Sequence, residues 1–378
     1  MTSAGLLFCE GREPDYGRRL SRLRWRRRFP EARPIAAAPS QRAADVLSGT
    51  ASWVVVRDES AIPFGAAGVA PRTGQVVLPA FLGGFASGQP HTLAELERAD
   101  FRPDCAGSAA QSSHAPALVF RREDFAAGPG EALDAFLGRL ASPPTPRAVE
   151  PGFGVFVFRD PSESPRPEVA TFVPPSCRRL LDVGCGAGAT GAELRRLRPE
   201  LVVEGIEQRP EAAALACTRL SRVHEGDASR VLARLVHEGS TYDGFLFADV
   251  LEHLPDPLEA LTLARRLAEP GATLVASVPN AGHLSLVRDL VQGRFDLLPA
   301  GLADAGHLRW FTRMSLCDTL EEAGWTVSAI QAEPGSEPPG AGAFLGRLTA
   351  LSMEREELLA YQWIAVACAR WTGHRSES

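Results

Sequence analysis

Beyond about residue 178, short apolar runs alternate with segments of helical spacing, and this regularity restricts the fold more than any other feature of the chain. The apolar runs lie at about residues 180–183, 201–206, 244–248 and 273–278. Continuous apolar runs of this length are typical of strands covered on both faces. Residues 256–268 place Leu258, Leu261 and Leu267 at helical spacing. The alternation predicts a doubly wound α/β fold, a parallel sheet with helices on both sides.

The first apolar run leads into a glycine-rich loop. Leu180-Leu181-Asp182-Val183 is followed by Gly184-Cys185-Gly186-Ala187-Gly188, and a helical stretch begins shortly after. Glycine is needed where the backbone turns tightly and where a ligand approaches it closely. The helix that follows offers unpaired N–H groups at its start. The loop therefore predicts a nucleotide-like ligand.

Two classes of ligand remain open for this loop. Gly186-x-Gly188-x-x-Gly191 matches the dinucleotide fingerprint, and Glu207 ends the next strand, where that fold binds a ribose hydroxyl. An NAD-dependent oxidoreductase is therefore one interpretation. Asp182 favours the other, because a carboxylate beside the glycines would repel a pyrophosphate but would suit an ammonium or sulfonium group.

Two more acids follow later strands. Asp227 lies in Gly226-Asp227-Ala228, where a carboxylate can accept a hydrogen bond from the amine of an adenine. Asp249 begins Asp249-Val250-Leu251-Glu252-His253 after the fourth apolar run. In open α/β sheets, ligands bind at the carboxyl ends of the strands. We therefore expect both acids at the ligand-binding edge.

In this order, the motifs of residues 179 to about 280 resemble the class I S-adenosylmethionine (SAM) dependent methyltransferases. The fold implied is a Rossmann-like methyltransferase sheet with SAM as cofactor. The resemblance implies that the loop and nearby strand ends bind SAM: Gly184, Gly186 and Gly188 at the methionine part beside Asp182, Glu207 at the ribose, Asp227 and Ala228 at the adenine, and Asp249 at the ammonium group.

The stretch from about 277 to 330 resembles a methyltransferase subgroup found beside sugar and polysaccharide biosynthesis. It has a Pro279-Asn280 turn, a helical insert and the segment His307-Leu308-Arg309-Trp310-Phe311-Thr312. We predict that Asn280 and Arg309 bind the acceptor. Alternatively, His307 and Arg309 are structural and join the insert to the sheet.

Three histidines are candidate general bases for a hydroxyl acceptor, because imidazole titrates near neutral pH. They are His307, the first choice because Arg309 is near, and His253 and His283.

Glu252-His253 is similar to a pair that contributes to a metal site in ubiquinone-pathway O-methyltransferases. A metal site needs about three or four protein ligands. The sequence offers no third, so we predict no metal. Cys185 is interpreted as a small loop residue, because no base partner accompanies it.

Proline-rich stretches divide the chain at residues 142–147, 161–168 and 174–176. We predict a smaller α/β accessory domain over residues 1–150, a linker over 151–178 and the methyltransferase domain over 179–378. Residues 54–59 and 120–140 faintly resemble a nucleotide-sugar glycosyltransferase domain without its metal-binding Asp-x-Asp, which implies that sugar transfer is lost. The alternative is a substrate-recognition or dimerisation domain.

Composition limits the partners of the chain. Among its 378 residues, 40 Lys and Arg face 46 Asp and Glu, a net charge of −6 that favours neither nucleic acid nor anionic lipid. The arginine-rich stretch Gly17–Phe29 is therefore interpreted as a solvated helix face, with binding of phosphate or nucleic acid as the alternative. Seven scattered cysteines fit a reducing cytoplasm. No signal peptide and no apolar stretch long enough to span a membrane are recognised.

These observations predict an enzyme that transfers a methyl group from SAM to a small-molecule acceptor, a hydroxyl of a sugar or natural product. The alternatives are a catalytically silent SAM-binding partner protein and the NAD-dependent oxidoreductase. A cytoplasmic location is expected, with a homo-oligomer as one option for assembly.

Overall fold

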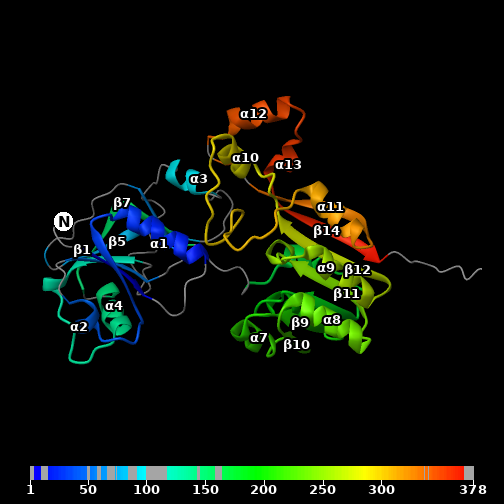
Figure 1. The fold of residues 1–378 in the computed structure, drawn as a ribbon, viewed down its shortest axis with the longest axis horizontal. Helices are drawn as coiled ribbons and strands as arrows, with labels where there is room; N and C mark the ends of the chain where they lie inside the picture. Colours follow the sequence, from blue (N-terminus) through cyan, green and yellow to red (C-terminus); the bar gives the residue numbers. More distant parts are fainter. Residues whose placement is uncertain are drawn as a thin grey trace, which may run out of the picture. The chain divides into compact units, whose positions relative to one another are not determined.

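A computed structural model divides the chain into two compact units, residues 1–159 with 294–306 and residues 160–293 with 307–378 (Figure 1). The residues it describes are 4–9, 16–48, 52–57, 61–65, 73, 75–83, 92–98, 117–142, 145–157, 164–335, 337–338 and 340–369. Among the described helices, none combines the length and the apolar character needed to cross a membrane.

The second unit contains a seven-stranded sheet in its described part, in the order β10-β9-β8-β11-β12-β14-β13. The strands are β8 (Arg179–Val183), β9 (Val202–Glu207), β10 (Arg222–Glu225), β11 (Tyr242–Ala248), β12 (Ala268–Pro279), β13 (Trp325–Pro334) and β14 (Ala360–Ala369). The first five pair in parallel, and β14 runs antiparallel to both β12 and β13. The four predicted apolar runs lie in β8, β9, β11 and β12, and the doubly wound α/β fold is confirmed.

Helices cover both faces of this sheet. They are α5 (Pro167–Ala170), α6 (Ala189–Leu197), α7 (Pro210–Ala216), α8 (Ala228–Glu238), α9 (Pro257–Leu267) and α11 (Arg313–Glu322). Three more helices, α10 (Leu284–Val291), α12 (Gly342–Ala350) and α13 (Arg355–Leu359), pack on one another in a separate cluster. Alternate residues of β11 face opposite sides. Phe245 and Phe247 pack in the core with α8, α9 and α11, and Leu246 packs in the core with α5, α6 and α7.

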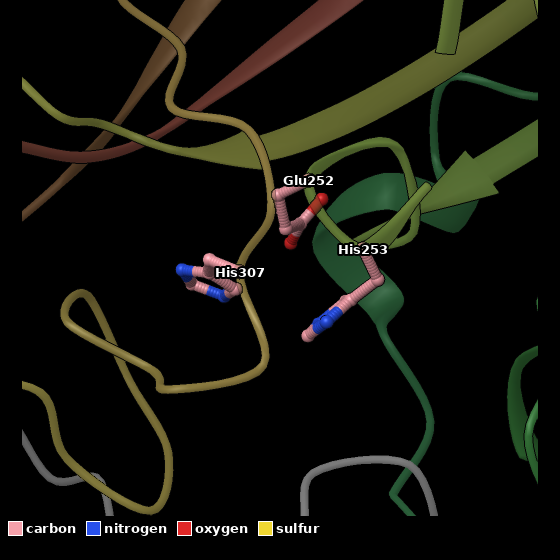
Figure 2. Close-up of side chains that lie close together, drawn as sticks. All are labelled: Glu252, His253 and His307. Atoms are coloured by element: carbon pink, nitrogen blue, oxygen red, sulfur yellow. The ribbon is translucent and has the colours of Figure 1, made fainter. Parts of the chain in front are cut away.

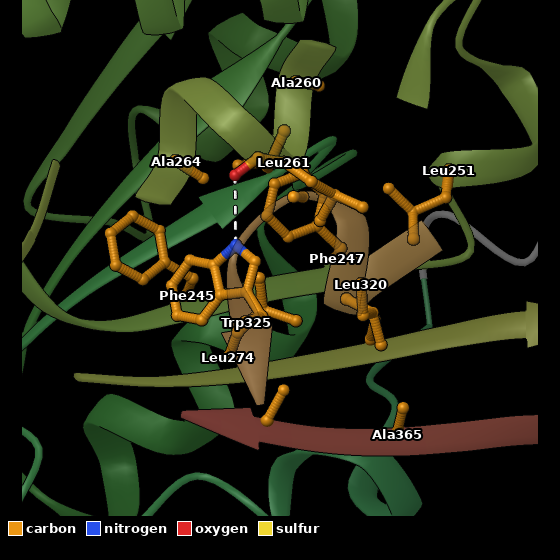
Figure 3. Packing of buried hydrophobic residues seen from close by; sticks show 14 of the residues in the cluster. Phe245, Phe247, Leu251, Ala260, Leu261, Ala264, Leu274, Leu320, Trp325 and Ala365 are labelled. Atoms are coloured by element: carbon orange, nitrogen blue, oxygen red, sulfur yellow. Dashed lines mark hydrogen bonds between the residues drawn. The ribbon is translucent and has the colours of Figure 1, made fainter. Parts of the chain in front are cut away.

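Trp325 anchors the start of β13 in the larger of these cores (Figure 3). Its side chain is fully buried, and its indole Nε1 donates a 3.0 Å hydrogen bond to the carbonyl oxygen of Leu261 in α9. The ring meets Phe245 edge to face at 5.5 Å. The helix it contacts begins as the sequence predicts, because the Asp256 side chain caps it at the Glu259 N–H and Pro257 occupies its first turn.

The first unit is also α/β, as predicted. Its sheet has the order β2-β1-β3-β6-β5-β7-β4 and mixes parallel with antiparallel pairs. The strands are β1 (Ala4–Cys9), β2 (Ala32–Ala37), β3 (Ser52–Val56), β4 (Ala61–Gly65), β5 (Val76–Gly83), β6 (Ala117–Arg121) and β7 (Arg147–Val157). The helices are α1 (Tyr16–Arg28), α2 (Ala43–Val46), α3 (Leu93–Arg98) and α4 (Leu133–Ala141).

The arginine-rich stretch forms α1, which packs on one face of that sheet through Trp25. Arg22 lies over the ring of Phe8, and Arg24 donates a 2.6 Å hydrogen bond to the carbonyl oxygen of Leu297. Arg19, Arg26 and Arg27 are exposed. Part of the basic stretch therefore packs inside the unit, and the exposed part fits the solvated face expected of it.

The boundary between the units differs from the predicted linker over 151–178. Strand β7 continues to Val157, so the first residues of that segment belong to the sheet, and α5 lies further along it. Pro151 is tolerated because pairing jumps here from Pro79 with Glu150 to Ala80 with Gly154, which leaves a bulge. The 294–306 segment, predicted to lie in the second domain, groups with the first unit.

Candidate cofactor and catalytic site

The glycine loop joins β8 to α6 through three residues that favour glycine. Gly184, Gly186 and Gly188 have φ angles of 72°, 54° and 75°, a region that other residues rarely adopt. A Cβ on Gly184 would lie 2.6 Å from Cγ2 of Val250, the residue after Asp249. The loop therefore closes against the end of β11 because it carries no side chain at Gly184.

Glu207, at the end of β9, faces this loop. Its side chain is almost fully buried, and its Oε2 accepts a 3.0 Å hydrogen bond from the N–H of Gly186. Its Oε1 accepts hydrogen bonds from the N–H and the Nε of Arg209, at 2.8 and 3.1 Å. A carboxylate offers about four acceptor positions. Glu207 is thus fixed in orientation with capacity to accept from a hydroxyl of a ligand.

Asp182 is buried one strand away from Glu207. Burial, with a smaller contribution from the charge of Glu207, raises the pKa of Asp182 to about 7. Burial also raises the pKa of the nearby Cys185 thiol, so this cysteine stays protonated and is a poor nucleophile. The buried carboxylates suit a ligand that brings positive charge.

Asp227 and Ala228 lie at the start of α8. Asp227 is the exposed N-cap residue, and its Oδ1 accepts a 3.0 Å hydrogen bond from the N–H of Arg230. Ala228 is buried. Asp227 thus caps α8, and this uses one of the two carboxylate oxygens.

Asp249 follows β11 with a φ of 54°, which is unusual for a residue other than glycine. Its Oδ1 accepts hydrogen bonds from Ser277 Oγ at 2.9 Å and from Gln362 Nε2 at 3.0 Å. Its Oδ2 forms an ion pair with Arg166. Neither Arg166 nor Gln362 is among the residues predicted from the sequence. Gln362 interrupts an otherwise apolar strand, and that was the signal that could have drawn attention to it.

Two of the three candidate histidines come together after Asp249 (Figure 2). The metal-binding side-chain atoms of Glu252, His253 and His307 all lie within 4.8 Å of one another. The His253 and His307 rings meet at 4.9 Å, and Trp310 flanks His307 at 5.4 Å. We call these three residues, Glu252, His253 and His307, the histidine cluster.

The backbone brings His307 to this place. The N–H groups of Leu308 and Arg309 both donate to the carbonyl oxygen of Glu252, at 2.8 and 3.0 Å. Glu252 itself is buried in the short helical turn Leu251–His253. One carboxylate and two imidazoles are also donors that a divalent cation accepts. The three side chains could together hold a divalent cation, with His307 in the third position that the sequence alone did not identify.

The other predicted residues have different surroundings. His283 is fully buried and caps α10, its Nδ1 accepting from the N–H of Ser285 at 3.2 Å. Asn280 is buried and donates to the carbonyl oxygens of Glu357 and Ala360. Arg309 is exposed and donates to the carbonyl oxygens of Leu308 and Pro255. The side chains of His283 and Asn280 hydrogen-bond to backbone groups inside the unit, which is a structural role. Neither is therefore placed in the catalytic site proposed below.

A profile of the family described as "Methyltransferase domain" matches residues 128–330, more than half of the chain. The chain is 32% identical to a ubiquinone biosynthesis O-methyltransferase of Cereibacter sphaeroides over 152 residues, covering 39% of this chain and 59% of that protein. For the enzyme of the same description from Hahella chejuensis, identity is 31% over 169 residues, 41% of this chain and 69% of the relative.

A solved structure of a SAM-dependent methyltransferase from Archaeoglobus fulgidus has 22% identity to the chain and a TM-score of 0.38, covering 51% of this chain and 86% of that one.

Proposed function

The chain belongs to the methyltransferase-domain family, whose cofactor is SAM, and on this premise we propose that it methylates a hydroxyl of a small molecule such as a sugar or natural product. The observation that carries the proposal is the position of the histidine cluster. Glu252 and His253 follow Asp249 at the carboxyl end of β11, and His307 reaches them through the backbone bonds to Glu252. The neighbouring strand β8 leads into the glycine loop, and Glu207 ends the strand after that, β9. A proton acceptor thus lies on the same sheet edge as the proposed cofactor residues.

The chemistry of the residues at this edge fits SAM. Gly184, Gly186 and Gly188 give the loop a positive-φ backbone, which would pass close to its methionine part. Glu207 would accept hydrogen bonds from the ribose hydroxyls, and Asp249 from the ammonium group. Asp227 and Ala228 would flank the adenine. The buried carboxylate of Asp182 would favour a positively charged cofactor over a pyrophosphate, so NAD is the poorer fit.

Within the histidine cluster, His307 would act as the general base. Bound SAM supplies a methyl group activated by its sulfonium, so the chain has to align the acceptor and remove its proton. The carboxylate of Glu252, within 4.8 Å of His307, would stabilise the imidazolium that forms. Arg309, two residues on, would bind the acceptor from the exposed side. His253 is the second candidate for the base.

A mass-spectrometric assay tests this function. The full chain would be incubated with SAM and a panel of hydroxylated acceptors, and the products would be examined for a gain of one methyl group and for S-adenosylhomocysteine. We expect both with the wild type and with His237→Ala, an exposed histidine on α8 that serves as the control. Binding of SAM without turnover on any acceptor would instead identify a silent SAM-binding protein.

A further inference from the structure

We infer that Gln362 of β14 is a positioning residue for the cofactor's amino-acid end, acting through Asp249. The inference rests on the proposed function, because it takes Asp249 as the partner of the methionine ammonium. Gln362 belongs to neither the glycine loop nor the histidine cluster, and it comes from the antiparallel strand that separates β12 from β13.

The Gln362 side chain connects two opposite charges. Its Nε2 donates to Oδ1 of Asp249 at 3.0 Å, and its Oε1 accepts from Arg166 at 2.6 Å. Asp249 and Arg166 also pair with each other, so the three side chains form a closed ring. Only one orientation of the amide satisfies this ring, because a guanidinium only donates and a carboxylate only accepts.

The three side chains of this ring are largely buried, which strengthens the hydrogen bonds that orient Asp249. Gln362 is 5% exposed, and the side chains of Asp249 and Arg166 are 18% and 17% exposed. Hydrogen bonds to charged groups in such surroundings are stronger than those between neutral groups. Ser277 of β12, the strand between β11 and β14, donates to the same Oδ1. The carboxylate is thus held in place by two neutral donors, Ser277 and Gln362, beside its ion pair with Arg166.

The carboxylates near Arg166 outnumber its single positive charge, which favours binding of one more cation beside Asp249. Arg166 is also paired with Glu168 and lies 3.9 Å from Glu333, the partner of Gln362 across β13 and β14. Three carboxylates therefore surround one guanidinium. Burial, and next the charge of Glu168, raise the pKa of Glu333, as expected where negative charge is in excess. The neutral amide of Gln362 therefore orients the Asp249 carboxylate without adding a positive charge of its own.

Calorimetry with two probes tests this role. S-adenosylhomocysteine carries the amino-acid end, and methylthioadenosine lacks it. We expect Gln362→Met, a near-isosteric change without the amide, to weaken S-adenosylhomocysteine about 10-fold or more, the effect of losing a hydrogen bond to a charged group. Methylthioadenosine should bind as it does to the wild type. The matched control is Gln331→Met, an exposed glutamine on β13, which should change neither affinity.

Two further measurements separate positioning from structural damage. Thermal unfolding shows whether Gln362→Met is folded, and Gln362→Asn provides a smaller amide if it is not. In an Asp249→Asn background, Gln362→Met should add little further loss of S-adenosylhomocysteine affinity, because the partner through which it acts has changed. Equal weakening of both probes, unchanged affinity for S-adenosylhomocysteine, or losses that add fully would overturn the inference. A wild type that binds neither probe would instead contradict the proposed function.

Discussion

The backbone N–H of Gly186 donates a 3.0 Å hydrogen bond to the carboxylate of Glu207, and this bond joins the loop after β8 to the end of β9. The two residues lie 21 positions apart in the chain. The acid that the proposal assigns to the ribose therefore also fixes the loop assigned to the methionine part.

Glu207→Ala should weaken S-adenosylhomocysteine binding while leaving the chain folded. The variant loses charge-assisted hydrogen bonds to the ribose hydroxyls, each worth roughly 1.5–3 kcal/mol. Calorimetry measures the affinity, and circular dichroism checks the fold. Unchanged affinity in a folded variant would remove Glu207 from the ribose site.

His307→Ala should lower the turnover number about 10²–10⁴-fold, because it removes the general base. Its affinity for S-adenosylhomocysteine should stay near that of the wild type. Arg309→Ala should instead raise the KM for the acceptor, as expected for binding shared by the ground and transition states. If turnover with His307→Ala is normal, the same assay on His253→Ala decides whether a histidine acts as the base.

Asp182 should make the folded state less stable as the pH rises from about 4 to about 7. Burial raises its pKa to about 7, so in this window the folded chain holds a proton that the unfolded chain has released. The free energy of unfolding then falls by at most about 1.4 kcal/mol per pH unit from this group. Denaturant unfolding of wild type and Asp182→Asn at several pH values isolates the effect. Parallel pH profiles of the two proteins would contradict it.

Gly184→Ala should destabilise the second unit by more than about 1 kcal/mol, since the new Cβ combines a positive φ with a 2.6 Å approach to Val250. Gly346→Ala, in α12, meets no atom within 4 Å and should be neutral or slightly stabilising. Chemical denaturation of the two variants gives the comparison. The assigned loop geometry would be contradicted if both changes had the same small effect.

Zinc should inhibit the enzyme through the histidine cluster, because Zn²⁺ takes the imidazole lone pair that the general base needs. Treatment with a chelator should leave the activity of purified protein unchanged. Metal analysis and activity assays follow both effects, and His253→Ala should bind zinc more weakly. Loss of activity on chelation with recovery on adding a divalent cation would show that a metal takes part.

The sequence predicted the features that depend on neighbouring residues. The strands, the glycine loop and the start of α9 follow from local patterns of apolar residues, glycine and capping groups. Contacts across long stretches of chain could not be predicted in this way. Nothing near Asp249 in the sequence indicates that Arg166 and Gln362 hold it, or that the backbone after His307 pairs with Glu252.

Polar residues at strand ends have roles that the sequence alone does not distinguish. Asn280 and His283 follow β12, where acceptor-binding side chains are expected, yet their polar groups bond to backbone inside the unit. The sequence alone does not distinguish a buried polar residue with a structural role from an exposed residue that binds a ligand, since both need the same hydrogen-bonding groups. Pro151 falls in the predicted linker for a similar reason, since the bulge that accommodates it depends on pairing with β5.

The order of the strands also affects the timing of folding during synthesis. β14 is made after every other described strand, yet it lies between β12 and β13 and pairs with both. As the ribosome extends the chain, β12 keeps one edge open until β14 emerges, and an open edge can pair with other chains. Gln362 reaches Asp249 only at that moment. A nascent chain stalled before β14 would thus be exposed to aggregation and would lack one of the donors that orient Asp249.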